Sequence, residues 1–289
     1  MVALGIRIVL DPEVQFVLSD RDKAFHPSPI AWEDQVLYFL LPDRFSDNNE
    51  TSYIGNDGWP FEGGSTPLYQ SQDSGNAVTN ATDTEAWLDA GARFVGGNLK
   101  GVTSKLGCLK RMGITALWIG PLFKQVQKLE TYHGYAVQNF LDVEPRFGTR
   151  EYLKELVRVT HSLGVYVLLD IILNHSANVY AYQAGSPVYT GSVYEVTGYY
   201  DANRNPTIPM ATIDPKAFPD AWPEAAIWPA ELQPMSCFTR KGQIQHWGDS
   251  PEFLDGDFFD LKDLSIGHND PDNFVATPAL HTLASAYKY

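Results

Sequence analysis

Residues 165–175 read Val165-Tyr166-Val167-Leu168-Leu169-Asp170-Ile171-Ile172-Leu173-Asn174-His175, and this stretch decides the fold. Its apolar run is short and uninterrupted, which is typical of a strand that helices cover on both faces of a parallel sheet. Asp170, Asn174 and His175 follow at the carboxyl end of that strand. Polar side chains at this end lie where α/β barrels build their active sites. The stretch alone also fits an ordinary buried strand with one capping Asp, so the rest of the chain has to decide between the two interpretations.

The sequence before this strand alternates between strand and helix patterns. We expect three strands, over 36–41, 114–119 and 165–173. Two helices should connect them, over 98–112 and 149–163. Gly113 and Gly164 stand where the two helices should end. Strand, helix, strand, helix, strand is the pattern of a parallel sheet. The pattern then stops, because residues 176–260 are rich in Pro, Gly and aromatic residues with little periodicity, and helical spacing resumes only over 277–289.

Composition and charge set limits on function. The chain has 289 residues, of which 44% are hydrophobic and 19% are charged, enough for a sizeable core. No apolar run approaches the roughly 18 residues that would indicate a membrane span. The formal net charge of −14 repels nucleic acid and anionic membranes and suits a neutral substrate. Met1–Pro12 lacks the basic start and long apolar stretch of a secretory signal, which favours a cytoplasmic location while leaving the compartment open.

Five separated blocks carry a resemblance to a known family. They are Pro42-Asp43-Arg44-Phe45, then Leu117-Trp118-Ile119-Gly120-Pro121 with Tyr132-His133-Gly134-Tyr135, then Phe147-Gly148-Thr149, then Asp170 to His175, and finally Leu261-Lys262-Asp263-Leu264-Ser265. In this order the blocks resemble those of glycoside hydrolase family 13, the α-amylase family. The last block is similar to the family's Leu-Pro-Asp-Leu-Asn block.

The resemblance implies an α/β fold, the (β/α)8 TIM barrel of the α-amylase type, with a domain B inserted after strand three. A complete barrel takes about 250 residues before insertions, so we expect this one to be truncated after about three strand–helix units. The expected parts are an N-terminal entry segment, the first part of the barrel, domain B and a truncated return to the barrel, over 1–33, 34–175, 176–262 and 263–289.

The implied chemistry is retaining cleavage or transfer of an α-glucosidic bond. It needs two carboxyl groups about 5–5.5 Å apart. In the family the nucleophile belongs to a Gly-x-Arg-x-Asp block after strand four, the acid/base Glu ends strand five, and a third Asp ends strand seven. No Gly-x-Arg-x-Asp block occurs in this sequence. We therefore expect all three catalytic carboxylates to lie beyond Tyr289, and the fragment to be inactive alone.

What the resemblance implies for this chain is the substrate-binding part of one active site. Tyr135 would stack on the sugar ring, and His133 and His175 would bond its hydroxyl groups, because imidazoles read hydroxyls as donor or acceptor. Asp170 would orient its neighbours as a structural residue, and its carboxylate would brace the guanidinium of Arg44. The alternative is that these are ordinary buried groups with satisfied hydrogen bonds.

The resemblance also implies a calcium ion that joins domain B to the barrel. Asn174 and Asp263 are the expected Ca²⁺ ligands in this chain, and both offer the hard oxygen donors that the ion prefers. A second candidate site comprises Asp47, Asn49 and Asn98, although a run rich in Gly, Asn and Asp is also ordinary turn chemistry. Trp222, Trp228 and Trp247 either line outer sugar subsites or build the core of domain B.

The sequence therefore predicts a retaining glycoside hydrolase or transglycosylase of the α-amylase family. Its partner would be an α-glucan or a maltooligosaccharide, with no nucleic acid and no membrane. Two alternatives stay open. One is a non-catalytic relative that binds carbohydrate or stabilises a partner, and the retained Tyr135, His133 and His175 argue against it. The other is a non-functional remnant of a broken gene.

Overall fold

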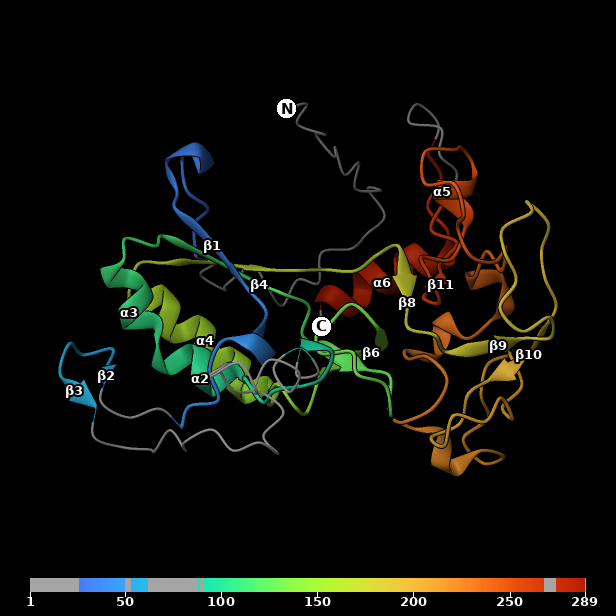
Figure 1. Cartoon of the computed structure of the whole chain (residues 1–289), viewed down its shortest axis with the longest axis horizontal. Coiled ribbons are helices and arrows are strands. Elements are labelled where there is room, and N and C mark those ends of the chain that lie inside the picture. Colours follow the sequence, from blue (N-terminus) through green and yellow to red (C-terminus); the bar gives the residue numbers. More distant parts are fainter. Residues whose placement is uncertain (1–25, 50–52, 62–87, 89–90, 268–273, 289) are drawn as a thin grey trace, which may run out of the picture. The chain divides into compact units, whose positions relative to one another are not determined.

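The computed structural model describes residues 26–49, 53–61, 88, 91–267 and 274–288. The chain divides into two compact units, residues 1–34 and 35–289. In the first unit the described part carries one 3-10 turn, η2 (Trp32–Asp34), and most of the expected entry segment lies outside the described residues. All elements below belong to the second unit (Figure 1).

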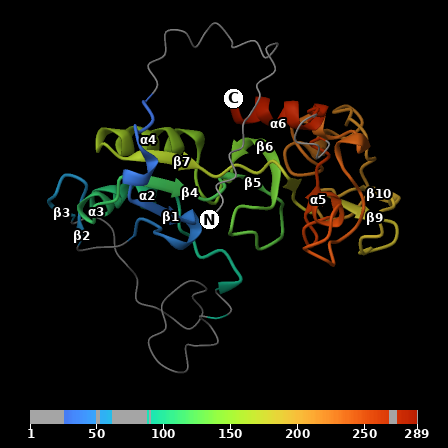
Figure 2. The same ribbon diagram turned by 90° about the horizontal axis from the view of Figure 1, so that it is seen from above.

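Three parallel strands form the sheet that the alternating pattern predicts. They are β1 (Leu37–Leu40), β4 (Ala116–Ile119) and β7 (Tyr166–Leu169), with β4 in the middle. The register places Phe39, Trp118 and Leu168 in one row across the sheet. Figure 2 shows the three strands beside the helices that connect them. Because the strands are parallel, their carboxyl ends meet at one edge of the sheet.

The two connections between these strands carry helices, whose ends follow the expected signals. The first connection holds α2 (Leu99–Ser104) and α3 (Leu106–Arg111), and the second holds α4 (Arg150–Ser162). The side chains of Asn98 and Thr149 each accept a hydrogen bond from a backbone amide in the first turn, so both are N-caps. Gly113 and Gly164 have φ angles of +88° and +68°, the left-handed conformation that ends a helix without steric cost only in glycine.

Two expected boundaries are wrong. The predicted helix over 98–112 is two helices, because the backbone leaves the helical conformation at Lys105 (φ −106°, ψ 3°). The third strand ends at Leu169 rather than at residue 173. The segment that follows is held instead by the last helix, α6 (Pro278–Lys288), where the hydroxyl of Tyr287 bonds both the amide and the carbonyl of Ile172, at 2.6 and 3.0 Å.

The sheet has one covered face and one open face. Leu117 and Ile119 are fully buried against the helices, as part of an apolar core of Leu40, Leu99, Val102, Leu106, Leu109, Ile114, Leu122, Val143, Phe147, Leu156 and Val165. On the other face Phe39 and Trp118 are 44% and 37% exposed, and their rings meet edge to face at 5.0 Å. The prediction of a third strand covered on both faces is therefore wrong. No residue of β7 is buried, because β7 is an edge strand and the helices cover one face.

Short elements make up the region that the sequence predicts to be domain B, and we keep that name for residues 175–263. They are β8 (His175–Ser176), β9 (Tyr180–Tyr182), β10 (Val196–Tyr199), η5 (Pro219–Ala221), η6 (Ala230–Leu232), η7 (Met235–Cys237), α5 (Glu252–Asp255) and β11 (Lys262–Asp263). β9 pairs with β10, and β8 pairs with β11, both antiparallel. Elsewhere the hairpin of β5 (Phe123–Gln125) and β6 (Val137–Val143) and the pair of β2 (Tyr53–Ile54) and β3 (Pro60–Phe61) complete the described strands. Most of the expected long loop over 47–83 lies outside the described residues.

The core of domain B is aromatic and contains buried hydroxyl groups. Tyr180 and Tyr199 are fully buried. The hydroxyl of Tyr180 donates to that of Tyr182 at 3.2 Å, and the hydroxyl of Tyr199 donates to the carbonyl of Gln233 at 2.8 Å. Leu283 of α6 belongs to the same core. Domain B and the last helix therefore pack as one body with β6.

The described elements stop short of a closed barrel: they give a three-stranded parallel sheet with its helices and the insertion. Within the described part of the chain, no helix combines the length and the apolar character needed to cross a membrane.

Candidate functional site

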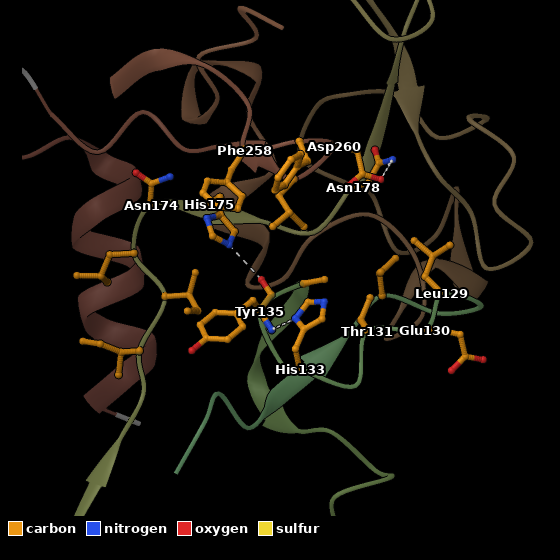
Figure 3. Close-up of a pocket in the computed structure, with 17 residues that line it drawn as sticks. Leu129, Glu130, Thr131, His133, Tyr135, Asn174, His175, Asn178, Phe258 and Asp260 are labelled. Atoms are coloured by element: carbon orange, nitrogen blue, oxygen red, sulfur yellow. Dashed lines mark hydrogen bonds between the residues drawn. The ribbon is translucent and has the colours of Figure 1, made fainter. Parts of the chain in front are cut away.

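A pocket of about 780 Å³ lies beyond the carboxyl end of β7. Three segments line it, at 126–136, 171–178 and 258–261. Figure 3 shows that Tyr135, His133 and His175, the three residues predicted to bind sugar, all lie on its wall. On the far side the amide of Asn178 donates to Asp260 at 3.2 Å. The structure therefore gathers the predicted sugar-binding residues in one cavity.

Tyr135 is the centre of the site, because each of its polar groups bonds another predicted residue. Its backbone amide donates to Nδ1 of His133 at 3.0 Å, and its carbonyl accepts from Nε2 of His175 at 3.1 Å. Its hydroxyl donates to Oδ2 of Asp170 at 3.0 Å. One residue thus fixes the positions of three others.

These bonds determine the protonation of both imidazoles. Nδ1 of His133 accepts a hydrogen bond from an amide, so its proton is on Nε2. A carbonyl only accepts, so His175 carries its proton on Nε2, and its Nδ1 is buried without a partner. Burial lowers the pKa of His133 and of His175, which keeps both rings neutral.

The hydroxyl of Tyr135 is held in its protonated form. Burial, together with the hydrogen bond and negative charge of Asp170, raises the pKa of Tyr135 to about 12. Asp170 therefore acts on the pocket through Tyr135, which suits the structural role that the sequence indicates.

Arg44 has partners other than the expected Asp170. Its guanidinium lies 3.5 Å from Asp43, donates to the carbonyl of Gly91 at 2.8 Å and stacks 3.7 Å above the ring of Tyr132. Asp43 is 2% exposed and accepts from the amides of 95 and 96. Burial raises its pKa, against those bonds. The block after β1 therefore braces the loop in front of α2, and Arg44 reaches the pocket segment through Tyr132.

An aromatic wall that the sequence analysis missed closes the pocket from domain B. Phe258 stacks on His175, with ring centres 6.0 Å apart and an angle of 19°. Phe259 is 65% exposed and has a φ angle of +57°, a conformation that a bulky residue adopts only under strain. Trp247 packs on both rings at 4.9 and 5.6 Å. The signal was present in the sequence, because Phe258-Phe259 precedes the Leu261–Ser265 block with only Asp260 between them.

The three tryptophans of domain B have different surroundings. Trp228 is 8% exposed, and its ring nitrogen donates to the carbonyl of Ala225 at 2.9 Å, so it belongs to the core. Trp222 is 51% exposed and packs edge-on against Trp228 at 4.7 Å. Only Trp247 adjoins the aromatic wall of the pocket.

The two expected calcium ligands are brought together through their backbones. The pairing of β8 with β11 places Asp263 opposite His175, and the carbonyl of Asn174 accepts from the amide of Leu264 at 2.8 Å. Asp263 is 2% exposed, and burial raises its pKa well above the ordinary value. Its Oδ2 is buried without a hydrogen-bond partner. Asn174 is exposed at the pocket wall.

The second candidate calcium site is occupied by turn and capping bonds. The carboxylate of Asp47 accepts from the amide and the side chain of Asn49, at 2.9 and 2.8 Å. The side-chain oxygen of Asn98 caps α2, and its nitrogen donates to the carbonyl of Asp47 at 3.2 Å. The three residues are therefore adjacent, with most of their polar atoms engaged.

A further cluster, which the sequence analysis did not identify, comprises His246, Asp249 and Glu252, whose polar atoms lie within 4.8 Å of one another. The carboxylate of Glu252 already accepts from two backbone amides and from the ring of His246. These bonds hold the loop between residues 245 and 252, and they account for the cluster without a metal ion.

The chain matches the family described as "Alpha amylase, catalytic domain" over residues 39–233. An α-amylase of Streptomyces lividans is 30% identical over an alignment of 201 residues, and the match covers 59% of this chain and 20% of that protein. Alpha-amylase 2 of Dictyoglomus thermophilum is 41% identical over 149 residues, which are 51% of this chain and 20% of that protein. The matches thus span about a fifth of the length of these curated relatives.

Among solved structures, the crystal structure of CldA, a cyclomaltodextrin glucanotransferase with a three-domain ABC distribution, superposes with a TM-score of 0.50. Its sequence is 26% identical, and the match covers 88% of this chain and 41% of that chain.

Proposed function

Because the chain belongs to the α-amylase catalytic-domain family, which has a fold of the TIM-barrel type, we propose that its pocket binds an α-glucan chain. The observation that carries the proposal is the convergence of His133, His175 and Asp170 on Tyr135. This arrangement fixes one aromatic ring and two neutral imidazoles at the end of a barrel-type strand, where such folds place their sites.

The chemistry of the wall suits a sugar. The faces of Tyr135 and Phe258 can cover the apolar side of a pyranose ring, while Nε2–H of His133 is a donor for a hydroxyl oxygen. Phe259 and Trp247 extend the aromatic surface along the rim, so a glucan of several units would contact more of it than a single glucose would. Neutral imidazoles suit an uncharged ligand.

We assign to this chain the substrate-binding part of a glycosidase or transglycosylase site. The family's nucleophile block is absent from the 289 residues, so the chain alone should bind a glucan without cleaving it. A retaining reaction would need two carboxyl groups supplied in addition to the residues described here.

A calcium ion is part of the proposal, because Asp263 fits one. Its buried Oδ2 lacks a hydrogen-bond partner, and a buried carboxylate oxygen without a partner is costly unless a cation or a proton satisfies it. Asp263 and Asn174 would hold the ion, which would link domain B to the end of β7 as a structural element. The second candidate site is not part of this proposal, because turn and capping bonds account for Asp47, Asn49 and Asn98.

The test is calorimetric titration of the chain with maltoheptaose, with the β-linked cellohexaose, one glucose unit shorter, as the comparison ligand. We expect a heat of binding with maltoheptaose and none with cellohexaose. The chain should release no reducing ends from either oligosaccharide. Tyr135→Ala should weaken binding about tenfold or more, which is about 1.4 kcal/mol for each factor of ten. Tyr152→Phe, a remote tyrosine on α4, is the control. Equal binding of both oligosaccharides, or cleavage by the chain, would contradict the proposal.

The calcium part has a separate test. Added Ca²⁺ should raise the unfolding midpoint of the chain, and Asp263→Asn should abolish the increase. An increase that survives this substitution would place the ion elsewhere.

A further inference from the structure

Asp257 is a fully buried carboxylate that joins three parts of domain B. Its Oδ2 accepts from the hydroxyl of Tyr182 on β9 at 2.9 Å and from Nζ of Lys262 at 3.3 Å. Its Oδ1 accepts from the backbone amide of Asp263 at 3.1 Å. A buried charge is tolerated only when it is paired and hydrogen-bonded, and Asp257 meets both conditions.

Lys262 is the buried cation of this arrangement. It is 5% exposed, and its ammonium lies 4.8 Å from the ring centre of Tyr182 and 5.2 Å from that of Tyr180. Lys262 thus places a cation one residue before Asp263 and 3.3 Å from the carboxylate of Asp257.

The bonds of Asp257 fix both ends of residues 258–261, the segment that carries the aromatic wall and that we call the wall from here on. This segment lies between Asp257 and β11, and within it the amide of Leu261 donates to the carbonyl of Phe258 at 3.1 Å. The backbone of Asp257 bonds the chain at 242 and 244, at 2.8 and 3.0 Å. One end of the wall is thus fixed by the backbone of Asp257, and the other end by its side chain.

We propose that Asp257 and Lys262 are positioning residues, a buried clamp that holds residues 258–261 against the pocket. None of the clamp contacts uses the carboxylate of Asp263, so the clamp holds the wall whether or not a cation binds there. The clamp supplies the rigidity that the strained Phe259 requires. This inference rests on the proposed function only for the identity of the ligand that the wall contacts.

Hydrogen exchange of peptides that cover residues 257–263, measured by mass spectrometry in EDTA, tests the clamp. Asp257→Asn and Lys262→Met should each accelerate exchange of this segment tenfold or more. The matched control is Asp255→Asn, which removes a neighbouring charge that is paired with Lys241 at 2.6 Å outside the clamp. It should change exchange by less than threefold. Peptides from α4 report global unfolding in every variant.

The double variant Asp257→Asn/Lys262→Met sharpens the test. If the two residues act as one pair, its effect should be no larger than that of either single variant. The proposal would be overturned if the single variants exchange at the wild-type rate. It would also be overturned if the double variant accelerates exchange by the product of the two single accelerations. A wild-type segment that gains protection only with calcium would overturn it too.

A milder variant covers the case in which the charged variants unfold. Tyr182→Phe removes the bonds of its hydroxyl to Asp257, to Tyr180 and to the amide of Gly242, and it leaves the ion pair. It should accelerate exchange of 257–263 about threefold or more, with α4 unchanged. No acceleration would overturn the proposal. Maltoheptaose titration of the same proteins judges the ligand separately: wild type that fails to bind it refutes the proposed function, while the exchange result still decides the clamp.

Discussion

The helix-covered sheet and domain B are packed by different means. Between the sheet and α2, α3 and α4, the buried core is mainly apolar, and Leu117, Ile119 and Leu156 are inaccessible to solvent. The buried hydroxyl of Thr160 bonds the carbonyl of Leu156 in its own helix, at 2.7 Å. In domain B the buried set includes Tyr180 and Asp257, together with the polar or charged side chains of Gln233, Lys262 and Asp263. The first core is specified by which residues are apolar. The second is specified by which polar atoms find partners.

The difference sets what each region tolerates. An apolar core loses stability in proportion to the volume removed, whereas a buried polar network loses it when one partner is left unsatisfied. The same conservative substitution should therefore have different costs in the two regions, and the following experiments measure that difference.

The largest effect is expected from Leu117→Ala in the middle strand. Leu117 is fully buried, so the substitution should cost about 3 kcal/mol of the free energy of unfolding, within the usual 2–5 kcal/mol range. Urea denaturation followed by circular dichroism measures it. Phe39→Leu on the open face is the comparison, and it should cost well under half as much. Equal costs would mean that the open face is also packed.

Tyr199→Phe should cost about 1–2 kcal/mol although almost no volume is lost. The substitution leaves the carbonyl of Gln233 without its 2.8 Å hydrogen bond inside the core of domain B. Tyr152→Phe, on the sheet side, is the matched change and should be nearly neutral. Denaturation midpoints decide, and a neutral Tyr199→Phe would show that apolar packing suffices in domain B as well.

The two exposed tryptophans of domain B should separate binding from packing. Trp247→Ala, which removes the support of Phe258 and Phe259, should weaken maltoheptaose binding about fivefold, whereas Trp222→Ala should leave binding within twofold. Calorimetric titration measures both. Equal losses would place both rings in sugar subsites, and a larger loss for Trp222→Ala would reverse the assignment.

The smallest effect is a pH dependence of the site. Burial lowers the pKa of His133, so the folded site favours the neutral ring. As the pH falls below about 6.5, the unfolded chain takes up a proton that the folded site resists, and the site loses stability. Above that pH the contribution is complete and constant. Maltoheptaose affinity should fall a fewfold between pH 7.5 and 5.5.

The variant His133→Asn tests the assignment, because its side-chain oxygen can accept the amide of Tyr135 at any pH. Its decline in affinity should be shallower than that of the wild type, with His175 supplying the remainder, since burial lowers its pKa too. If maltoheptaose affinity falls equally with pH in the wild type and in the variant, His133 does not cause the pH dependence.

Hydrophobic periodicity predicted the strands and helices of the sheet region because apolar residues recur there at regular spacing. Spacing and end signals predicted β1, β4 and β7, the helix ends at Gly113 and Gly164, and α6. They did not predict the break at Lys105 and the early end of β7, because distant residues contact both places. The side chain of Asn56 bonds the carbonyl of Thr103 and the amide of Gly107 on either side of the break, and Tyr287 bonds Ile172 after β7. For the same reason the insertion could be recognised only by the loss of pattern.

The candidate site was predictable as a set of residues and not as a network. His133, Tyr135 and His175 belong to short motifs, and the structure gathers them in one pocket. Their bonds could not be predicted, since Asp170 meets Tyr135 rather than Arg44. Phe259 was overlooked although it stands two residues before the Leu261–Ser265 block, because hydrophobic spacing does not reveal its left-handed conformation.

The long-range contacts of the pocket have a consequence for how the chain is made. Tyr135 and Asp170 are 35 positions apart, and Ile172 is secured by Tyr287, 115 positions later. Closing loops of this length slows folding, and ribosomes add about 5–20 residues each second. The sheet with its connecting helices can therefore form on a nascent chain many seconds before the pocket exists, and during synthesis its open face is available to chaperones first.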